Sequence, residues 1–139
     1  MNNIIRLIIN YILSYLYLYN MNNKIFGDQG ESIAIKHLID KGYKILESNW
    51  RVGRLEVDII AMDDKTLVFI EVKTRNTSYF GFPENAVNTK KQRFLTNAAN
   101  AYIHQRNLTN ENRFDIMSII IENEHFELEH IEDAFYLMK

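Results

Sequence analysis

Two strand-forming runs with charges in their interiors constrain this chain most. Residues 53–60 and 67–74 alternate β-branched or aliphatic residues with polar ones, a pattern typical of β-strands. Asp58 in the first run, and Glu71 and Lys73 in the second, stand where a core strand ordinarily carries Val or Ile. Burying such groups is costly unless they are paired or bind a metal. The pattern therefore indicates a site as well as a sheet.

The spacing of these charges predicts their geometry. Side chains alternate along a strand, so Glu56 shares a face with Asp58, and Glu71 shares one with Lys73. A tight turn at 63–65 closes an antiparallel hairpin that places Asp58 opposite Glu71, with Cβ atoms about 5 Å apart. Two such carboxylates suit Mg²⁺ or Mn²⁺, and Lys73 is placed to stabilise a developing charge or orient a water. The alternatives are a Glu71–Lys73 ion pair on a solvated face and an Asp58 carboxylate bonded to backbone amides.

The remaining elements predict an α/β fold. Hydrophobic periodicity favours helices over 25–41, ended by Gly42, and over 89–106, with Thr89 as N-cap. Strands are expected at 43–50, 55–62, 66–74 and 113–122, with a loop at 75–83 and a short edge strand at 124–130. The resulting order, α-β-β-β-α-β, predicts a mixed central sheet flanked by helices.

The N-terminal segment differs from the rest of the chain. We expect an apolar extension at 1–22 and one folded domain at 23–139, which is long enough to bury a core. Met21-Asn22-Asn23 repeats the opening tripeptide, so the extension is interpreted as upstream of the working domain. The alternative is an anchor helix, which would bring membrane contact with it. The chain has no cysteine, which excludes disulfides and thiolate sites and allows the cytoplasmic location that we expect.

Charge is distributed unevenly along the chain. The net charge is −2, yet residues 73–106 carry six Lys or Arg against one acid, and residues 113–139 carry seven acids against two bases. A basic middle leaves room for a phosphate-binding face, although solvated surface charge would give the same pattern. The candidate nucleic-acid contacts are Arg51, Arg54, Arg75, Lys90, Lys91 and Arg93.

Other residues receive plainer interpretations. Gln92, at the start of the second helix, is a weaker candidate for orienting an attacking water, and Trp50 is expected in packing. The four histidines share no metal-ligand spacing and are interpreted as structural or surface groups.

Eight short runs, in order along the chain, resemble a known family. They are GDQGE at 27–31, NWR at 49–51, EVD at 56–58, FIEVKTR at 69–75, GFP at 81–83, KQR at 91–93, FD at 114–115 and HIEDAF at 130–135. The chain resembles the YraN-like family of uncharacterised small bacterial proteins. This family lies within the restriction-endonuclease-like nuclease superfamily, whose motif is an acid, a gap and then acid-x-Lys. The proline that often precedes the first acid is Val57 here.

The resemblance implies a Mg²⁺- or Mn²⁺-dependent endonuclease acting on DNA. The chain is also similar to archaeal Holliday-junction resolvases, which implies branched DNA as substrate and a homodimer. These resolvases carry an acid on the first helix, here Glu31, which adds a third metal ligand to Asp58 and Glu71. Gly27 and Gly30 are expected to let that helix approach the sheet. Two alternatives stay open: a non-catalytic nucleic-acid-binding module with the nuclease fold, and a membrane-tethered interaction protein.

Overall fold

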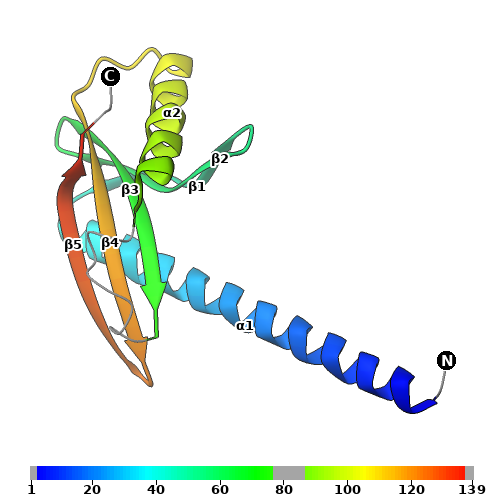
Figure 1. Ribbon diagram of the computed structural model, residues 1–139. Helices are drawn as coiled ribbons and strands as arrows, with labels where there is room; N and C mark the ends of the chain where they lie inside the picture. The colour runs from blue at the N-terminus through cyan, green and yellow to red at the C-terminus, as the bar shows by residue number, and fades with distance from the viewer. Residues whose placement is uncertain (1–2, 77–86, 137–139) are drawn as a thin grey trace.

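A computed structural model describes residues 3–76 and 87–136, with side chains before Gly27 described only at five isoleucines. The elements are α1 (Asn3–Asp40), β1 (Lys44–Val52), β2 (Leu55–Asp63), β3 (Thr66–Arg75), α2 (Thr89–Gln105), β4 (Asn112–Glu122) and β5 (His125–Phe135) (Figure 1). The loop expected at 75–83 falls mostly outside the described residues.

The five strands form one mixed sheet in the order β1-β2-β3-β4-β5. Neighbouring strands are antiparallel except β3 and β4, which are parallel and are joined through α2. A parallel pair needs such a crossover, whereas the antiparallel pairs are joined by short turns. Figure 1 shows α1 and α2 on opposite sides of this sheet. The predicted α/β class with a mixed sheet and flanking helices is therefore confirmed.

Each face of the sheet has its own apolar core. One core lies under α2 and includes Ile60, Phe69 and Phe114 with Leu95 and Tyr102 of the helix, and the partly buried Trp50 packs against it as predicted. The second core lies under α1, where Ala34 and Leu38 of the helix meet strand residues that include Ile59, Val68, Ile70 and Met117. Burial on both faces explains why β3 is almost continuously apolar from Leu67 to Val72.

Helix α1 ends where the sequence indicates. Gly42 adopts φ +91°, and the amide of Tyr43 donates to the carbonyl of Leu38. This left-handed termination satisfies carbonyls of the last turn, and glycine adopts it without a Cβ penalty.

Three predicted boundaries were wrong. Helix α1 begins at Asn3 rather than at residue 25, since no helix-breaking residue lies between these positions. Strand β5 has 11 residues rather than being a short edge strand. Asn88, not Thr89, caps α2, because its side chain accepts the amide of Lys91 at 2.9 Å. The division between an extension at 1–22 and a domain at 23–139 stays a prediction. Over the described part of the chain, no helix is long and apolar enough to cross a membrane.

Candidate active site

Asp58 and Glu71 come together where the ladders beside them break. The β2–β3 ladder runs from Asp63↔Thr66 to Ile59↔Ile70, so Asp58 and Glu71 hold the next opposed positions, just beyond the last pair. Asp58 Oδ2 instead accepts the amide of Val72 at 2.8 Å. A carboxylate thus replaces the carbonyl that a continuing ladder would supply. The two acids therefore lie near each other, although outside the paired ladder in which they were expected, and Asp58 bonds a backbone amide, as the alternative expected.

Glu71 is a buried carboxylate with one unsatisfied oxygen. Its side chain is 7 % exposed, and Oε1 lies 3.3 Å from Nζ of Lys91, at the start of α2. Glu71 Oε2 has no hydrogen-bond partner among the described residues. An unsatisfied buried carboxylate oxygen is expensive, so this position favours a ligand that can bind it.

The electrostatics of Asp58 point the same way. Burial, followed by the negative charge of Glu71, raises the pKa of Asp58 to about 7, against the opposing effects of the Val72 amide and Lys91. Two carboxylates that share a poorly hydrated site disfavour each other's ionised form. A bound cation offsets both the cost of burying the two negative charges and the repulsion between them, as at metal sites generally.

Glu31 reaches the same region from α1. Its Oε2 accepts a hydrogen bond of 2.8 Å from the side chain of Asn49. Burial raises the pKa of Glu31, and the charges of nearby acids, Asp58 among them, add to the increase, whereas the bond from Asn49 opposes it. The close approach of α1 depends on Gly30, since a Cβ there would lie 1.8 Å from Oγ1 of Thr74. The same expectation for Gly27 was wrong, because no described atom lies within 4 Å of its hypothetical Cβ.

Asn49 was missed by the sequence analysis. It has φ +51° within β1 and lies between the pairs Ser48↔Ile59 and Trp50↔Val57, at the position facing Asp58. Asparagine adopts this left-handed conformation more readily than most residues. Its place in the NWR run was the available signal, although that run said nothing of a contact with Glu31.

The cations expected around the site take different positions. Lys73 is exposed, two residues beyond Glu71 on β3, and its side chain makes no hydrogen bond or ion pair with a described residue. Arg54, Lys90 and Arg93 are also exposed, and Arg75 is partly buried at the end of β3. Two others are engaged: Arg51 pairs with Glu56 at 3.2 Å, and Lys91 pairs with Glu71. Gln92 donates through its side chain to the carbonyl of Val87 at 3.2 Å.

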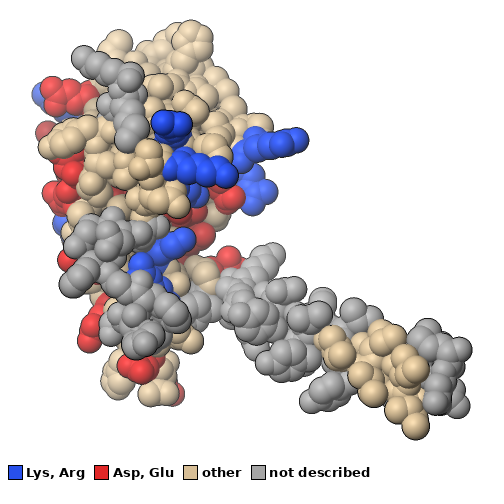
Figure 2. Space-filling view, in the orientation of Figure 1, with Lys and Arg blue, Asp and Glu red and all other residues tan. Residues whose placement is uncertain are grey.

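Figure 2 shows how these charges are arranged on one face of the molecule. Blue Lys and Arg side chains gather over the β1–β2 turn, over the start of α2 and below it, with red acidic atoms between them. A pocket of about 170 Å³ lies at the β1–β2 turn, lined by Arg51, Arg54 and Glu56 among others. The acidic site is thus bordered by positive charge, the arrangement that attracts a phosphate backbone.

The side chains fit a hard divalent cation only in part. Within residues 3–76 and 87–136, no group of three Asp, Glu or His side chains is arranged to hold a metal ion. Mg²⁺, however, takes one or two carboxylates and completes its shell with waters and substrate oxygens. Asp58 and Glu71 supply two carboxylates, and the unsatisfied Oε2 of Glu71 supplies a free ligand atom. The pair therefore fits such an ion. Glu31 is a candidate third ligand whose carboxylate is hydrogen-bonded to Asn49 in this structure.

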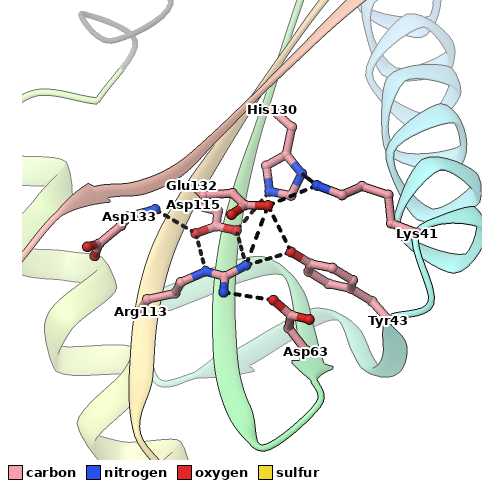
Figure 3. Close-up of polar contacts among 8 residues, drawn as sticks. All are labelled: Lys41, Tyr43, Asp63, Arg113, Asp115, His130, Glu132 and Asp133. Carbon is pink, nitrogen blue, oxygen red and sulfur yellow. Dashed lines mark hydrogen bonds and ion pairs between the residues drawn. The ribbon is translucent and has the colours of Figure 1, made fainter.

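A second polar cluster, also missed from the sequence, lies on the α1 side of the sheet (Figure 3). Its centre is the buried Asp115 of β4, which accepts from Nε of Arg113 at 3.0 Å and from the amide of Asp133 at 3.0 Å. His130 Nε2 lies 2.8 Å from Asp115 Oδ2. Although burial alone would raise it, these bonds hold the pKa of Asp115 below its ordinary value.

This cluster fastens the end of α1 to the sheet. Lys41 donates to Glu132 at 2.9 Å, and Arg113 donates both to Tyr43 Oη and to Asp63. The donors and acceptors are matched to one another. The cluster therefore stabilises the fold, which agrees with the interpretation of its histidine, His130, as a structural group.

The fold and the site define a class: an α/β protein with a restriction-endonuclease-like core and an acidic pair on two adjacent strands. The chain belongs to a family described as Uncharacterised protein family UPF0102, which matches residues 30–119. A UPF0102 protein of Flavobacterium psychrophilum is 44% identical over 110 residues, covering 79% of this chain and 92% of the relative. One of Geobacter metallireducens is 44% identical over 119 residues, covering 85% and 98%, respectively.

Proposed function

We propose that this protein is a divalent-metal-dependent phosphodiesterase that cleaves nucleic acid, with DNA as its substrate. The observation that carries the proposal is the Asp58–Glu71 pair. The two acids lie on adjacent strands; the partly buried Asp58 has a pKa raised to about 7, and the buried Glu71 has an unsatisfied oxygen. Perturbed carboxylates of this kind are concentrated at catalytic sites.

The side chains have distinct roles in this proposal. Asp58 and Glu71 would hold Mg²⁺ or Mn²⁺, with Glu31 as a third ligand from α1. When bound, the ion supplies Lewis acidity toward the phosphate and lowers the pKa of a water. Lys73 would orient that water and stabilise negative charge on the phosphate, since its ammonium is exposed and not engaged by a described residue.

The surrounding cations give the substrate class. Arg54, Lys90 and Arg93 are exposed around the site, and Arg51 lies beside Arg54 at the β1–β2 turn. Contacts of this type position a phosphate backbone without reading sequence. The similarity to resolvases favours branched DNA and a homodimer, which analytical ultracentrifugation of the full chain would detect.

A cleavage assay with the full chain tests the proposal. The substrates are single-stranded, duplex, flap and four-way-junction DNA, each with Mg²⁺, with Mn²⁺ or with chelator. Glu71→Gln removes the central ligand, and Glu129→Gln removes an exposed acid of β5 as a matched control. We expect metal-dependent cutting by the wild type and by Glu129→Gln, and a loss of at least about 100-fold in Glu71→Gln. Undiminished cutting by Glu71→Gln would refute the site.

A non-catalytic nucleic-acid-binding module is the second candidate. It is favoured by one observation, that Lys91 pairs with Glu71 at 3.3 Å and so supplies a positive charge to that carboxylate from within the protein. Salt-sensitive DNA binding without cutting under any metal condition would establish this alternative.

A further inference from the structure

Lys91 contacts the acidic pair directly. Its Nζ lies 3.3 Å from Glu71 Oε1, and its charge also acts on Asp58, opposing the rise in the pKa of that acid. The other exposed cations bordering the site have no such contact with the acidic pair. Lys91 therefore differs from them in kind, although the sequence grouped it with Lys90 and Arg93.

The backbone of Lys91 is held by hydrogen bonds, whereas its side chain is partly exposed. The Lys91 amide donates to the Asn88 cap, and the next amide, of Gln92, donates to the Asn88 carbonyl at 2.9 Å. The side chain is 38 % exposed, so solvent reaches it directly. A lysine side chain has several rotatable bonds and a compact charge, which lets it exchange one anionic partner for another with its backbone in place.

We propose that Lys91 is a built-in substitute cation that occupies the acidic pair until a divalent metal displaces it, and that the displaced ammonium then contacts a substrate phosphate. This inference rests on the proposed function, because it concerns the same metal site. Lys91 makes one ion pair with Glu71, whereas a divalent ion can bind Asp58 as well as the unsatisfied Oε2. The start of α2, where Lys91 lies, is also favourable for an anion such as phosphate.

Two opposite effects of removing this ammonium follow. Lys91→Met eliminates the competitor and the repulsion between like charges, so the metal should bind about tenfold more tightly. The same variant lacks a phosphate contact, so DNA binding in the presence of metal should weaken. The slope of the logarithm of the binding constant against the logarithm of salt concentration should decrease in magnitude by about 1. If Lys91 were purely structural, its replacement would not tighten metal binding, and it would not combine tighter metal binding with weaker DNA binding.

The test is calorimetric titration of Mn²⁺ into the full chain, without nucleic acid. It compares the wild type with Lys91→Met, with Lys91→Arg, which keeps a cation, and with Glu71→Gln. Lys44→Met serves as a matched control, since Lys44 is exposed and its side chain makes no hydrogen bond or ion pair with a described residue. Thermal unfolding with and without Mn²⁺ checks that each variant folds and gives a second measure of metal binding.

The outcomes separate this inference from the proposed function. Support requires tighter Mn²⁺ binding in Lys91→Met, near-wild-type binding in Lys91→Arg and Lys44→Met, and no binding in Glu71→Gln. Equal or weaker binding in Lys91→Met, with normal binding by the wild type, overturns the substitute-cation role and leaves the metal site intact. Absence of Mn²⁺ binding in both the wild type and Lys91→Met overturns the inference and the proposed metal site together.

Discussion

Replacing each of two glycines of α1 by alanine should have opposite effects on stability. Alanine is the better helix former by about 1 kcal/mol, so with no other effect both variants would be stabilised. At Gly27 no described atom lies within 4 Å of the new Cβ, so Gly27→Ala should raise the free energy of unfolding by about 0.5–1 kcal/mol. At Gly30 the new Cβ would meet Oγ1 of Thr74 at 1.8 Å and both Cβ and Cγ2 of Thr74 at 2.9 Å.

The clash at Gly30 cannot be relieved by a rotamer change alone. Turning the Thr74 side chain moves Oγ1 but leaves its Cβ in place, so the helix itself must move away from β3. Overpacking of this kind costs about 1–3 kcal/mol, and more where backbones must move. The cost exceeds the helix gain, so we expect Gly30→Ala to lose about 2 kcal/mol net, which lowers the melting temperature by roughly 4–8 °C in a domain of this size.

Urea unfolding followed by far-UV circular dichroism measures both changes. Because Glu31 follows Gly30 directly and is bonded to Asn49, the shifted helix should also weaken Mn²⁺ binding, whereas Gly27→Ala should leave it unchanged. A Gly30→Ala protein as stable as Gly27→Ala would refute the packing argument. Adding Thr74→Ala should restore only part of the loss, since the Cβ contact at 2.9 Å remains.

Three further predictions concern charged residues. In chelator, the pKa of Asp58 is raised from 3.8 in the unfolded chain to about 7 in the folded protein, so folding is accompanied by proton uptake between these pH values. The free energy of unfolding is therefore highest at low pH and falls as the pH rises from 3.8 to about 7. Asp58→Asn should thus be about 4 kcal/mol more stable than the wild type at pH 8 and equal to it near pH 4, by urea unfolding; a difference independent of pH would contradict this. Asp115→Asn should lose about 3 kcal/mol at pH 7 in the same assay, since it removes the buried carboxylate that pairs with the partly buried Arg113, whereas Glu129→Gln should change little. Arg54→Ala should weaken DNA binding evenly across sequences and lower the salt slope by about 1 in fluorescence anisotropy, and an unchanged slope would exclude a phosphate contact.

The paired acids were predictable because their geometry is local. Strand alternation and a tight turn at 63–65 determine which residues oppose each other in a hairpin, so Asp58 and Glu71 follow from counting. Asp115 carried the same signal, an acid inside an apolar strand, and the argument used for Glu71 would have found it. Its partners were hidden, because they depend on a β4–β5 register shift beside Asp115 and on a left-handed Asp133.

Contacts between elements were not predictable from one sequence. The Lys91–Glu71 pair depends on how α2 lies over the sheet, and the Glu31–Asn49 bond depends on an irregular position in β1. The predicted start of α1 was wrong for a different reason. The helix was predicted from residue 25 onward, although no residue between 3 and 25 ends a helix.

The bond between the Val72 amide and the Asp58 carboxylate makes one backbone group a spectroscopic probe. Most amides of β3 donate within the sheet, whereas this one donates to the side chain that titrates and that we propose binds metal. In a nitrogen–proton correlation spectrum, the Val72 resonance should therefore shift with the protonation of Asp58. A diamagnetic ion such as Mg²⁺ should shift it again. In 15N-labelled protein, this single assigned peak would follow occupancy of the acidic pair without substrate or mutation.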